Sequence, residues 1–359
     1  MAAVRHPPAV PFFIRFSTAR IRFGPKLARR LSFFMGALVA GALQGLALAA
    51  YGPFQDSEIY YNLFLEVTGS GLWPSLSEYA NQTGKFEPVA ALIFWFESLF
   101  LGSSPEPFAF LLTNMVLLNL LVAQTVGRRL FPDGGPLLAF AVPLLCLSSY
   151  LIFSKQLYFW RSALSFCFFL NAVGSLGLKR ALWIAAAVFA HYSAAAFLLL
   201  YFILQIAART SRPVLYEVLV TLLLIIATVF TGELSLLTFF VSGGDLEVFL
   251  VPGEHGARLA IAVLACLIVA LLSYRRPAAA TRPLLVFSLV LLVVSLANIN
   301  NYHLMQRLSL PAFFVIPFIP FAYRWRGIRL LSARWAIALS VLPTLRLWYM
   351  LATGEFTPG

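Results

Sequence analysis

The chain has 359 residues, of which 61% are hydrophobic and 11% are charged, and its formal net charge is +12 at pH 7. A soluble domain carries about 25% charged residues, so this composition excludes a water-soluble globular protein and indicates a polytopic membrane protein. The positive charge does not indicate a nucleic-acid partner, because the basic residues fall in short loops between apolar runs rather than on one face.

The N-terminal tail (1–30) contains several Lys and Arg residues and no acidic residue. Lys and Arg accumulate in cytoplasmic segments, so this tail is predicted to lie inside the cell. The apolar run after it begins too far from the N-terminus for a cleaved signal peptide and is predicted to be a retained span. We therefore expect this tail, one transmembrane domain (31–350) and a short C-terminal tail (351–359).

Apolar runs long enough to cross a membrane recur along the chain. A helix needs about 20 apolar residues to cross the hydrocarbon core. Two further segments, 86–101 and 181–206, are apolar but irregular. The pattern predicts an all-α polytopic integral membrane protein of about 10–12 membrane helices. The regular runs lie near 31–50, 108–127, 136–153, 162–178, 214–231, 258–273, 284–299, 308–323 and 331–350.

The two irregular segments decide the predicted topology. Segment 86–101 is short and carries two acidic residues, and a His-Tyr-Ser sequence interrupts segment 181–206. If both cross once, two basic clusters lie outside. If the first does not fully cross and the second turns back at His191, every basic cluster lies inside, which satisfies the charge rule. A helix break at membrane depth must line a cavity or be buried, so this topology predicts an outward-facing, water-accessible cavity near His191.

Several polar side chains fall at outer helix ends or at the break in this topology. Each has an ordinary structural explanation: Asp56 can cap a helix, Glu87 suits a helix N-terminus, and Arg307 can reach the interface on its long stem. Arg161 lies among apolar and aromatic residues with no acid near it in sequence. The full set is Asp56, Glu58, Glu87, Arg161, His191, His303 and Arg307.

Arg161 and Arg307 are exceptions to a charge rule that the other basic residues largely follow. The planar guanidinium binds phosphate oxygens through two parallel hydrogen bonds. Two arginines, a histidine and carboxylates on the outer side suit a pyrophosphate-linked substrate in the outer leaflet. Its chemistry needs a base for an incoming hydroxyl and a cation for the departing pyrophosphate.

Five stretches of the chain resemble, in the same order, the EpsG-type, Wzy-like bacterial polysaccharide polymerases. That family has an early Asp followed by Tyr, a Glu-Pro that opens a helix, an Arg-Gln-x-x-Ala segment, a His-x-Ser and a late Arg. The chain departs from it at Ser162, where the family has the Gln, so a role carried over for that position does not apply. The stretches are DSEIYYNLF (56–64), KFEPVAALIFWFESLFLG (85–102), YFWRSALSFCFFL (158–170), FAHYSAAAFLLLYFI (189–203) and LMQRLSLPAFFVIPF (304–318).

The resemblance implies a membrane glycosyltransferase of the bacterial inner membrane with a fold like the GT-C enzymes and O-antigen ligases. It would join oligosaccharide repeats carried on polyprenyl (undecaprenyl) pyrophosphate at the outer face, for exopolysaccharide or O-antigen. No metal or cofactor is expected, and a chain-length regulator is an expected partner. Arg161 and Arg307 would clamp the pyrophosphate. His191, Asp56 and Glu87 are the catalytic candidates, and Glu58, Tyr60, Ser193 and His303 are candidate substrate contacts.

Two other classes of membrane protein remain as alternatives. A membrane O-acyltransferase that modifies glycans would also use a histidine within the membrane. It is expected to pair that histidine with an acid or Asn nearby, and residues 187–195 contain neither. A polysaccharide or lipid transporter (flippase) is favoured by internal duplication, which the two halves of the chain do not show.

Overall fold

The structure of the chain is a computed structural model, and nearly all of the residues that it describes are helical. The all-α prediction is therefore confirmed. Two three-residue strands, β1 (Ile14–Phe16) and β2 (Ala19–Ile21), pair antiparallel in the N-terminal tail. The described residues are 14–16, 19–21, 24–49, 56–83, 86–127, 130, 135–149, 152–153, 156, 160–241, 253–274, 282–322, 345, 349 and 352–353.

The helices follow the apolar runs of the sequence, with boundaries set mainly by Pro and Gly. They are α1 (Pro25–Ala49), α2 (Asp56–Ser70), α3 (Leu72–Thr83), α4 (Pro88–Leu101), α5 (Pro107–Gly127), α6 (Pro136–Leu147), α8 (Trp160–Val173), α9 (Gly177–Ala190), α10 (Ser193–Ala207), α11 (Pro213–Val241), α12 (Gly253–Tyr274), α13 (Arg282–Ala297), α14 (Tyr302–Val315), the 3₁₀ turn η2 (Ile316–Phe318) and α15 (Ile319–Ala322). Proline is tolerated at the first helical position because the amide hydrogen it lacks has no partner there.

Five helical segments in the described part of the chain are long and apolar enough to cross a membrane. This confirms the prediction of an all-α membrane protein at that level. Within the predicted span 136–153, α6 ends at Leu147, where the amide of Ser148 bonds back to Leu144 and Cys146 and closes the last turn, and Ile152 and Phe153 are again helical. The predicted span 331–350 lies almost wholly outside the described residues. The five segments are Pro25–Leu48, Pro107–Gly127, Pro213–Phe230, Gly256–Tyr274 and Leu304–Phe321.

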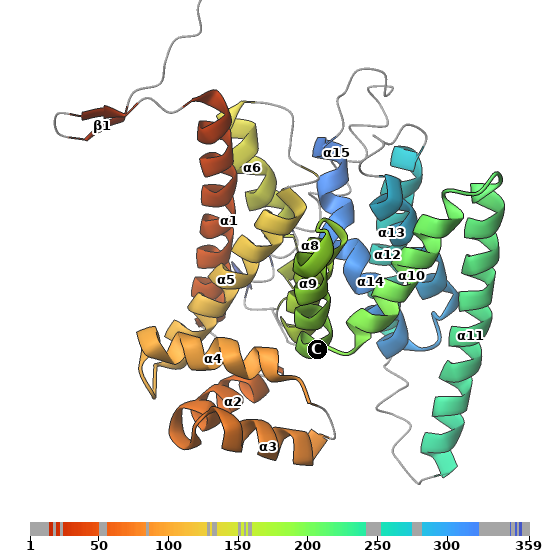
Figure 1. The fold of residues 1–359 in the computed structure, drawn as a ribbon, viewed down its shortest axis with the longest axis horizontal. Coiled ribbons are helices and arrows are strands. Elements are labelled where there is room, and N and C mark those ends of the chain that lie inside the picture. Colours follow the sequence, from red (N-terminus) through yellow and green to blue (C-terminus); the bar gives the residue numbers. More distant parts are fainter. Residues whose placement is uncertain are drawn as a thin grey trace, which may run out of the picture.

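Helix α1 packs closely against α5 and α6 on one side of the molecule (Figure 1). Glycines make this approach possible. A Cβ atom on Gly41 would lie 2.7 Å from the Cα of Val116, and one on Gly45 would lie 2.7 Å from the Cα of Leu112. Small residues four positions apart let helix backbones approach in membranes. The same interface buries a hydrogen bond of 2.5 Å from Asn119 to Gln44.

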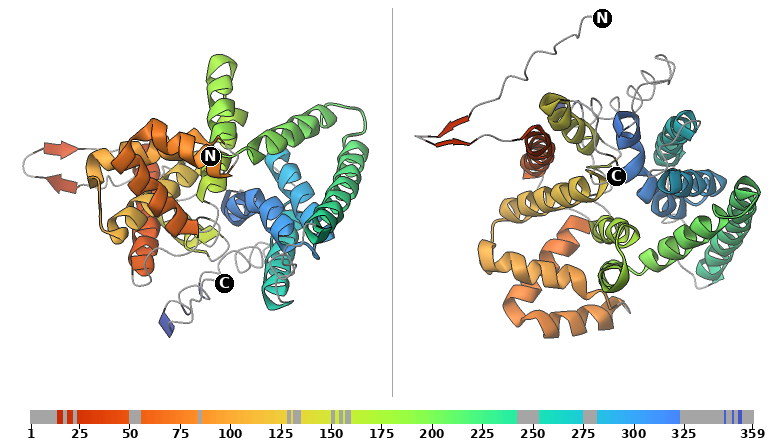
Figure 2. Two further views of the ribbon diagram at one scale, coloured as in Figure 1. Left: turned by 90° about the horizontal axis from the view of Figure 1, so that it is seen from below. Right: turned by 45° about the horizontal axis from the view of Figure 1, so that its top comes forward.

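Helix α11 lies at the edge of the molecule in both views of Figure 2. Its apolar side chains are largely exposed; Leu223, Ile226 and Phe230, for example, are exposed by two thirds. In a soluble protein such a face would be an aggregation hazard, whereas the hydrocarbon of a bilayer covers it without cost. The exposed face of α11 therefore agrees with the membrane assignment.

Helices α2, α3 and α4 lie together at one end of the molecule, crosswise to α1 (Figure 1). This is the arrangement expected if segment 86–101 does not fully cross. Helix α4 begins after the Glu87–Pro88 pair and ends at Gly102, which has a φ of +79° that favours glycine. Phe94 anchors α4 by packing its ring against Phe64, Phe110 and Trp160.

The predicted break in segment 181–206 is present. Helix α9 ends at Ala190 and α10 begins at Ser193, with His191 in extended backbone (φ −163°, ψ 125°). Figure 1 shows α9 and α10 running in opposite senses, so the chain turns back at this point. His191 is half-buried at the break. The predicted water-accessible cavity at this position stays a prediction.

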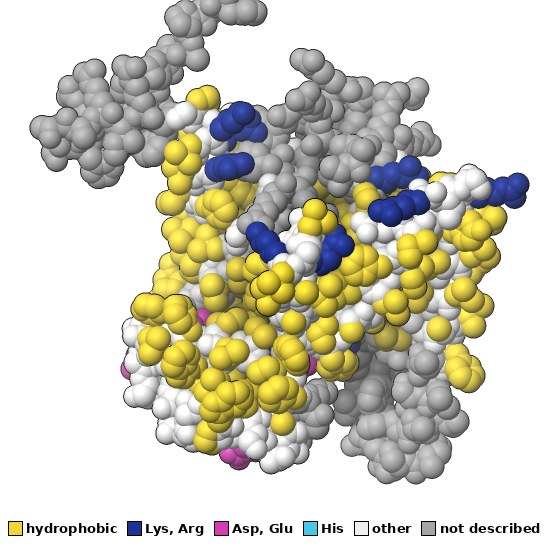
Figure 3. Space-filling view, viewed as in Figure 1, with side chains coloured by type: hydrophobic (Ala, Val, Ile, Leu, Met, Phe, Trp, Pro, Cys, Tyr) yellow, Lys and Arg dark blue, Asp and Glu magenta, His cyan; other side chains and the backbone are white. Residues whose placement is uncertain are grey.

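Charged side chains of the described residues separate along the molecule. Figure 3 shows Lys and Arg gathered towards the upper end, where α1, α9 and α11 begin, and Asp and Glu towards the lower end, around α2 to α4. Loop charges predict this separation for a membrane protein. Helix α1 begins at Pro25, so the last residues of the predicted tail (1–30), including Arg29 and Arg30, belong to its first turns.

Candidate functional site

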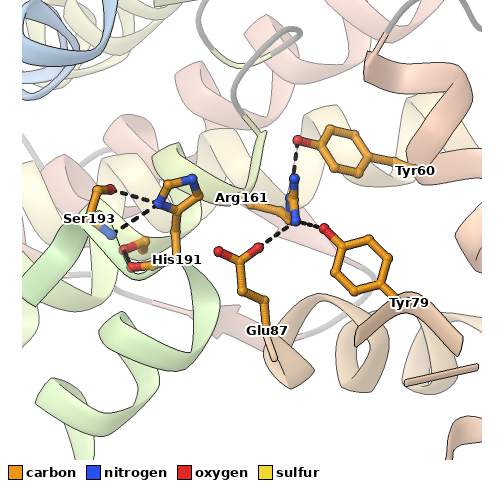
Figure 4. A network of polar contacts seen from close by, with 7 residues as sticks. Tyr60, Tyr79, Glu87, Arg161, His191 and Ser193 are labelled. Atoms are coloured by element: carbon orange, nitrogen blue, oxygen red, sulfur yellow. Dashed lines mark hydrogen bonds and ion pairs between the residues drawn. The ribbon is translucent and has the colours of Figure 1, made fainter. Parts of the chain in front are cut away.

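Arg161 lies in the first turn of α8 and is the centre of a polar network (Figure 4). Its Nη1 forms an ion pair with Oε2 of Glu87 and also donates a hydrogen bond to the hydroxyl of Tyr79. Its Nε donates to the hydroxyl of Tyr60 at 3.5 Å. The Arg161 side chain is 20% exposed and that of Glu87 is 3% exposed, so the ion pair is mostly withdrawn from water.

Two tyrosine rings flank the guanidinium of Arg161. The Cζ atom lies 5.5 Å from the ring centroid of Tyr60 and 5.4 Å from that of Tyr79, within the range of cation–π attraction. Nη2 makes no hydrogen bond with any described residue. The network therefore holds Nε and Nη1 and leaves Nη2 for another acceptor.

Glu87 precedes α4, but its side chain does not cap that helix. The carboxylate forms an ion pair with Arg161 instead, and the predicted favourable effect of its charge at the N-terminus of α4 stays a prediction. Its second oxygen, Oε1, is buried and has no hydrogen-bond partner among the described residues. A buried carboxylate oxygen without a partner is costly, which marks it as a position where a ligand proton or hydroxyl is favoured.

His191 is oriented by the residue that begins α10. Its Nδ1 accepts hydrogen bonds from the backbone N–H of Ser193 at 3.2 Å and from the Ser193 hydroxyl at 2.7 Å. The ring stacks on Tyr192 with centroids 4.8 Å apart. Because Nδ1 accepts from a backbone N–H, the neutral ring carries its proton on Nε2. In this geometry His191 presents a hydrogen-bond donor at Nε2.

Ser165 connects the histidine to the arginine helix. It lies one turn after Arg161 on α8, and its hydroxyl donates to the carbonyl of Ala187 at 2.8 Å and to that of His191 at 3.4 Å. On the other side, α4 packs against α9, with the rings of Phe86 and Phe189 6.4 Å apart. The structure thus brings Arg161, Glu87 and His191 together, and in Figure 4 the carboxylate lies between the other two.

The remaining predicted residues divide into two groups. Tyr60 and Ser193 belong to the network, as contacts of Arg161 and His191. Glu58 is exposed on α2, and Arg307 is exposed on α14, without a hydrogen bond or ion pair to the described residues of this network. Helix α14 nevertheless packs against α8 through the rings of Phe314 and Phe166, 6.2 Å apart. The side chains of Asp56 and His303 lie outside what the structure describes.

Further buried polar residues, which the sequence did not single out, bond to one another between α1, α4 and α5. Glu97 on α4 is buried and accepts a hydrogen bond of 3.1 Å from Asn114 on α5. Gln156 donates to Asn119 at 3.1 Å, and Asn119 bonds to α1. Polar residues inside apolar runs are the signal that marks them, because such residues are expensive in a membrane interior. Tyr79 carries no comparable signal.

No protein-family model matches the chain, and comparison with curated proteins and with solved structures found no match either. The functional argument therefore depends on the residues and their geometry.

Proposed function

We propose that the chain is an integral membrane glycosyltransferase, a Wzy-like polysaccharide polymerase of the bacterial inner membrane. It joins oligosaccharide repeats carried on polyprenyl pyrophosphate at the outer face, within a GT-C-like bundle of about 10–12 membrane helices. One observation carries the proposal: a mostly buried Arg161 is held by Glu87 and two tyrosines at the end of the molecule opposite the basic clusters. By the charge rule that end faces outward.

In this proposal Arg161 binds the pyrophosphate of the donor. Glu87 and Tyr79 hold Nη1 and fix the plane of the guanidinium, which presents Nη2 to a phosphate oxygen. Preorganised donors lower the barrier because they are already aimed where charge develops. Arg307, exposed on α14, is the proposed second contact and closes on the other phosphate when the donor is bound.

The proposed transfer step uses Glu87 and His191 on the acceptor side. The acceptor hydroxyl gives its proton to Oε1 of Glu87, and its oxygen forms the new glycosidic bond to the anomeric carbon. The bond from that carbon to the phosphate oxygen breaks, and the pyrophosphate leaves with the electron pair towards Arg161. His191 donates from Nε2 to a phosphate or sugar oxygen, since its Nδ1 is occupied by Ser193.

The direct test uses the purified chain in liposomes with polyprenyl-pyrophosphate-linked repeat units. We expect a ladder of products that are longer by whole repeats, and release of polyprenyl pyrophosphate in equal number to new linkages. The Arg161→Ala protein is the inactive control. Repeat units that stay monomeric with the wild-type protein, under conditions where it remains folded, contradict the proposal.

A glycan O-acyltransferase is the second candidate, and the position of Glu87 favours it. Residues 187–195 offer no acid to pair with His191, but α4 brings this carboxylate to the same site (Figure 4). The two activities differ in the donor. Transfer of a labelled acyl group from a thioester to the lipid-linked glycan, without any change in repeat number, supports the second candidate and contradicts the first.

A further inference from the structure

At the end of the molecule opposite α2 to α4 (Figure 1), α1 and α5 line a cavity of about 640 Å³. Its lining residues are Lys26, Arg29, Arg30, Phe33, Phe34, Ala123, Gln124 and Gly127. The glycine shapes this cavity, since a Cβ on Gly127 would lie 2.7 Å from the ring of Phe33. Phe33 is buried as a result and forms part of the apolar wall.

Among the described residues that line this cavity, three are basic and none is acidic. All three basic residues come from the first two turns of α1, so their charges converge on one space. Arginine forks and a lysine ammonium suit the oxygens of a phosphodiester. The volume is also in the range that holds a small-molecule headgroup.

An exposed apolar stripe on α1 borders the cavity at Phe34, a lining residue that is 38% exposed. Leu27, Leu31, Met35 and Leu38 recur at three- and four-residue spacing and are exposed by 47%, 44%, 49% and 37%. Such spacing places them on one face of the helix. A ligand that uses both features has an anionic head and a long apolar chain. A free phosphate would contact only the cations and leave the stripe unoccupied.

We propose that this cavity is a binding site for an anionic phospholipid such as phosphatidylglycerol. The phosphodiester lies against Lys26, Arg29 and Arg30, and an acyl chain lies along Phe34 and Leu38. Basic pockets between membrane helices on the cytoplasmic side are suited to anionic headgroups. The site is separate from the Arg161 network and does not depend on the proposed glycosyltransferase activity.

Native mass spectrometry of the full chain measures lipid that stays bound after purification and titration. The probes are phosphatidylglycerol, phosphatidylcholine and inorganic phosphate. We expect retention of phosphatidylglycerol at least tenfold above phosphatidylcholine. The Arg29→Gln/Arg30→Gln protein is expected to lose about tenfold or more of its phosphatidylglycerol binding, because each basic residue contributes to attraction of an anionic lipid.

Two further variants control for general charge and for folding. Arg209→Gln/Arg212→Gln removes two charges from exposed positions at the same end and should leave lipid retention unchanged. Gln124→Glu places a negative charge in the cavity wall with little change of shape and should weaken retention by itself. Equal losses in the two arginine pairs, normal retention in Gln124→Glu, or displacement of the lipid by millimolar phosphate would each overturn the proposal.

Discussion

Arg161 has an acidic partner that stands 74 positions earlier in the chain. No acidic residue lies near position 161 in the sequence, so the sequence alone places a cation in an apolar segment without a counterion. The fold resolves this by packing α3 and α4 against the start of α8, which brings Tyr79 and Glu87 to the guanidinium. Arg161 and Glu87 were predictable as separate candidates; their ion pair was not, because it depends on tertiary packing.

Arg161→Lys tests whether the arginine acts as a fork. Lysine keeps the charge and a long stem, so a residue that merely reaches the interface tolerates the change. Lysine has a single nitrogen and cannot bond Glu87 and Tyr79 while a second nitrogen faces phosphate, so we expect about a hundredfold less polymer, equivalent to roughly 3 kcal/mol of transition-state stabilisation. Arg161→Ala should be at least as severe, and Arg307→Lys similar. The measurement is polymer length and amount in a deletion strain complemented with each variant, at matched protein level.

Glu87→Gln tests the ion pair as a unit. Loss of one partner leaves a largely buried charge uncompensated, which typically lowers the free energy of unfolding by about 3–5 kcal/mol. The loss should be smaller here, because the Arg161 side chain is 20% exposed to water. Glu87→Gln/Arg161→Gln removes both charges and should recover part of that loss. Thermal unfolding of the purified proteins in detergent completes a double-mutant cycle. Additive losses, with no coupling beyond about 0.5 kcal/mol, would show that the pair does not contribute as a pair.

At the scale of elements, the break between α9 and α10 was predictable and its detail was not. Loop charges favour a chain that turns back in this segment, and the polar His-Tyr-Ser sequence interrupts its apolar run. The bond from Ser193 to Nδ1 of His191 depends on rotamers and local backbone angles. The end of α6 at Leu147 was not predictable either, because the apolar run continues beyond that residue.

Ser193→Ala removes the hydroxyl that bonds His191 at 2.7 Å and keeps the backbone contact. If His191 acts from a fixed orientation, activity should fall about tenfold, since looser positioning weakens a catalytic contact. Ser211→Ala, at an exposed position between α10 and α11, is the matched control and should be neutral. Polymer yield at equal protein level is the measurement. Equal activity in both variants would assign Ser193 a purely structural role.

Gly45→Ala and Gly69→Ala form a matched pair for the contact between α1 and α5. The new Cβ at Gly45 would lie 2.7 Å from the backbone of Leu112, whereas nothing lies within 4 Å of a Cβ at Gly69. Overpacking costs about 1–3 kcal/mol, so Gly45→Ala should lower the melting temperature of the detergent-purified protein. Gly69→Ala, in the open part of α2, should leave it unchanged or raise it slightly. Equal melting temperatures would contradict the close packing.

At the scale of the whole molecule, charge and hydropathy together give the membrane protein two different ends. Basic side chains gather at one end (Figure 3), and α2 to α4, whose Tyr79 and neighbouring Glu87 contact Arg161, lie at the other (Figure 1). Composition was enough to predict an all-α membrane protein, and loop charges were enough to predict which segments share an end. They were not enough to predict the crosswise packing of α2, α3 and α4, which depends on aromatic contacts such as that of Phe94 with Trp160.

Cysteine accessibility decides which end faces outward. Cys146, Cys167 and Cys266 are buried, and after their replacement a single cysteine is introduced at Glu58 or at Ala208. Both positions are exposed, and they lie towards opposite ends of the molecule. The positive-inside rule places Ala208, beside Arg209 and Arg212, in the cytoplasm. A membrane-impermeant maleimide should therefore label Glu58→Cys in intact cells and Ala208→Cys only after permeabilisation. Labelling of Ala208→Cys from outside would reverse the orientation and move the Arg161 network to the cytoplasmic face, where a donor presented from the outer leaflet cannot reach it.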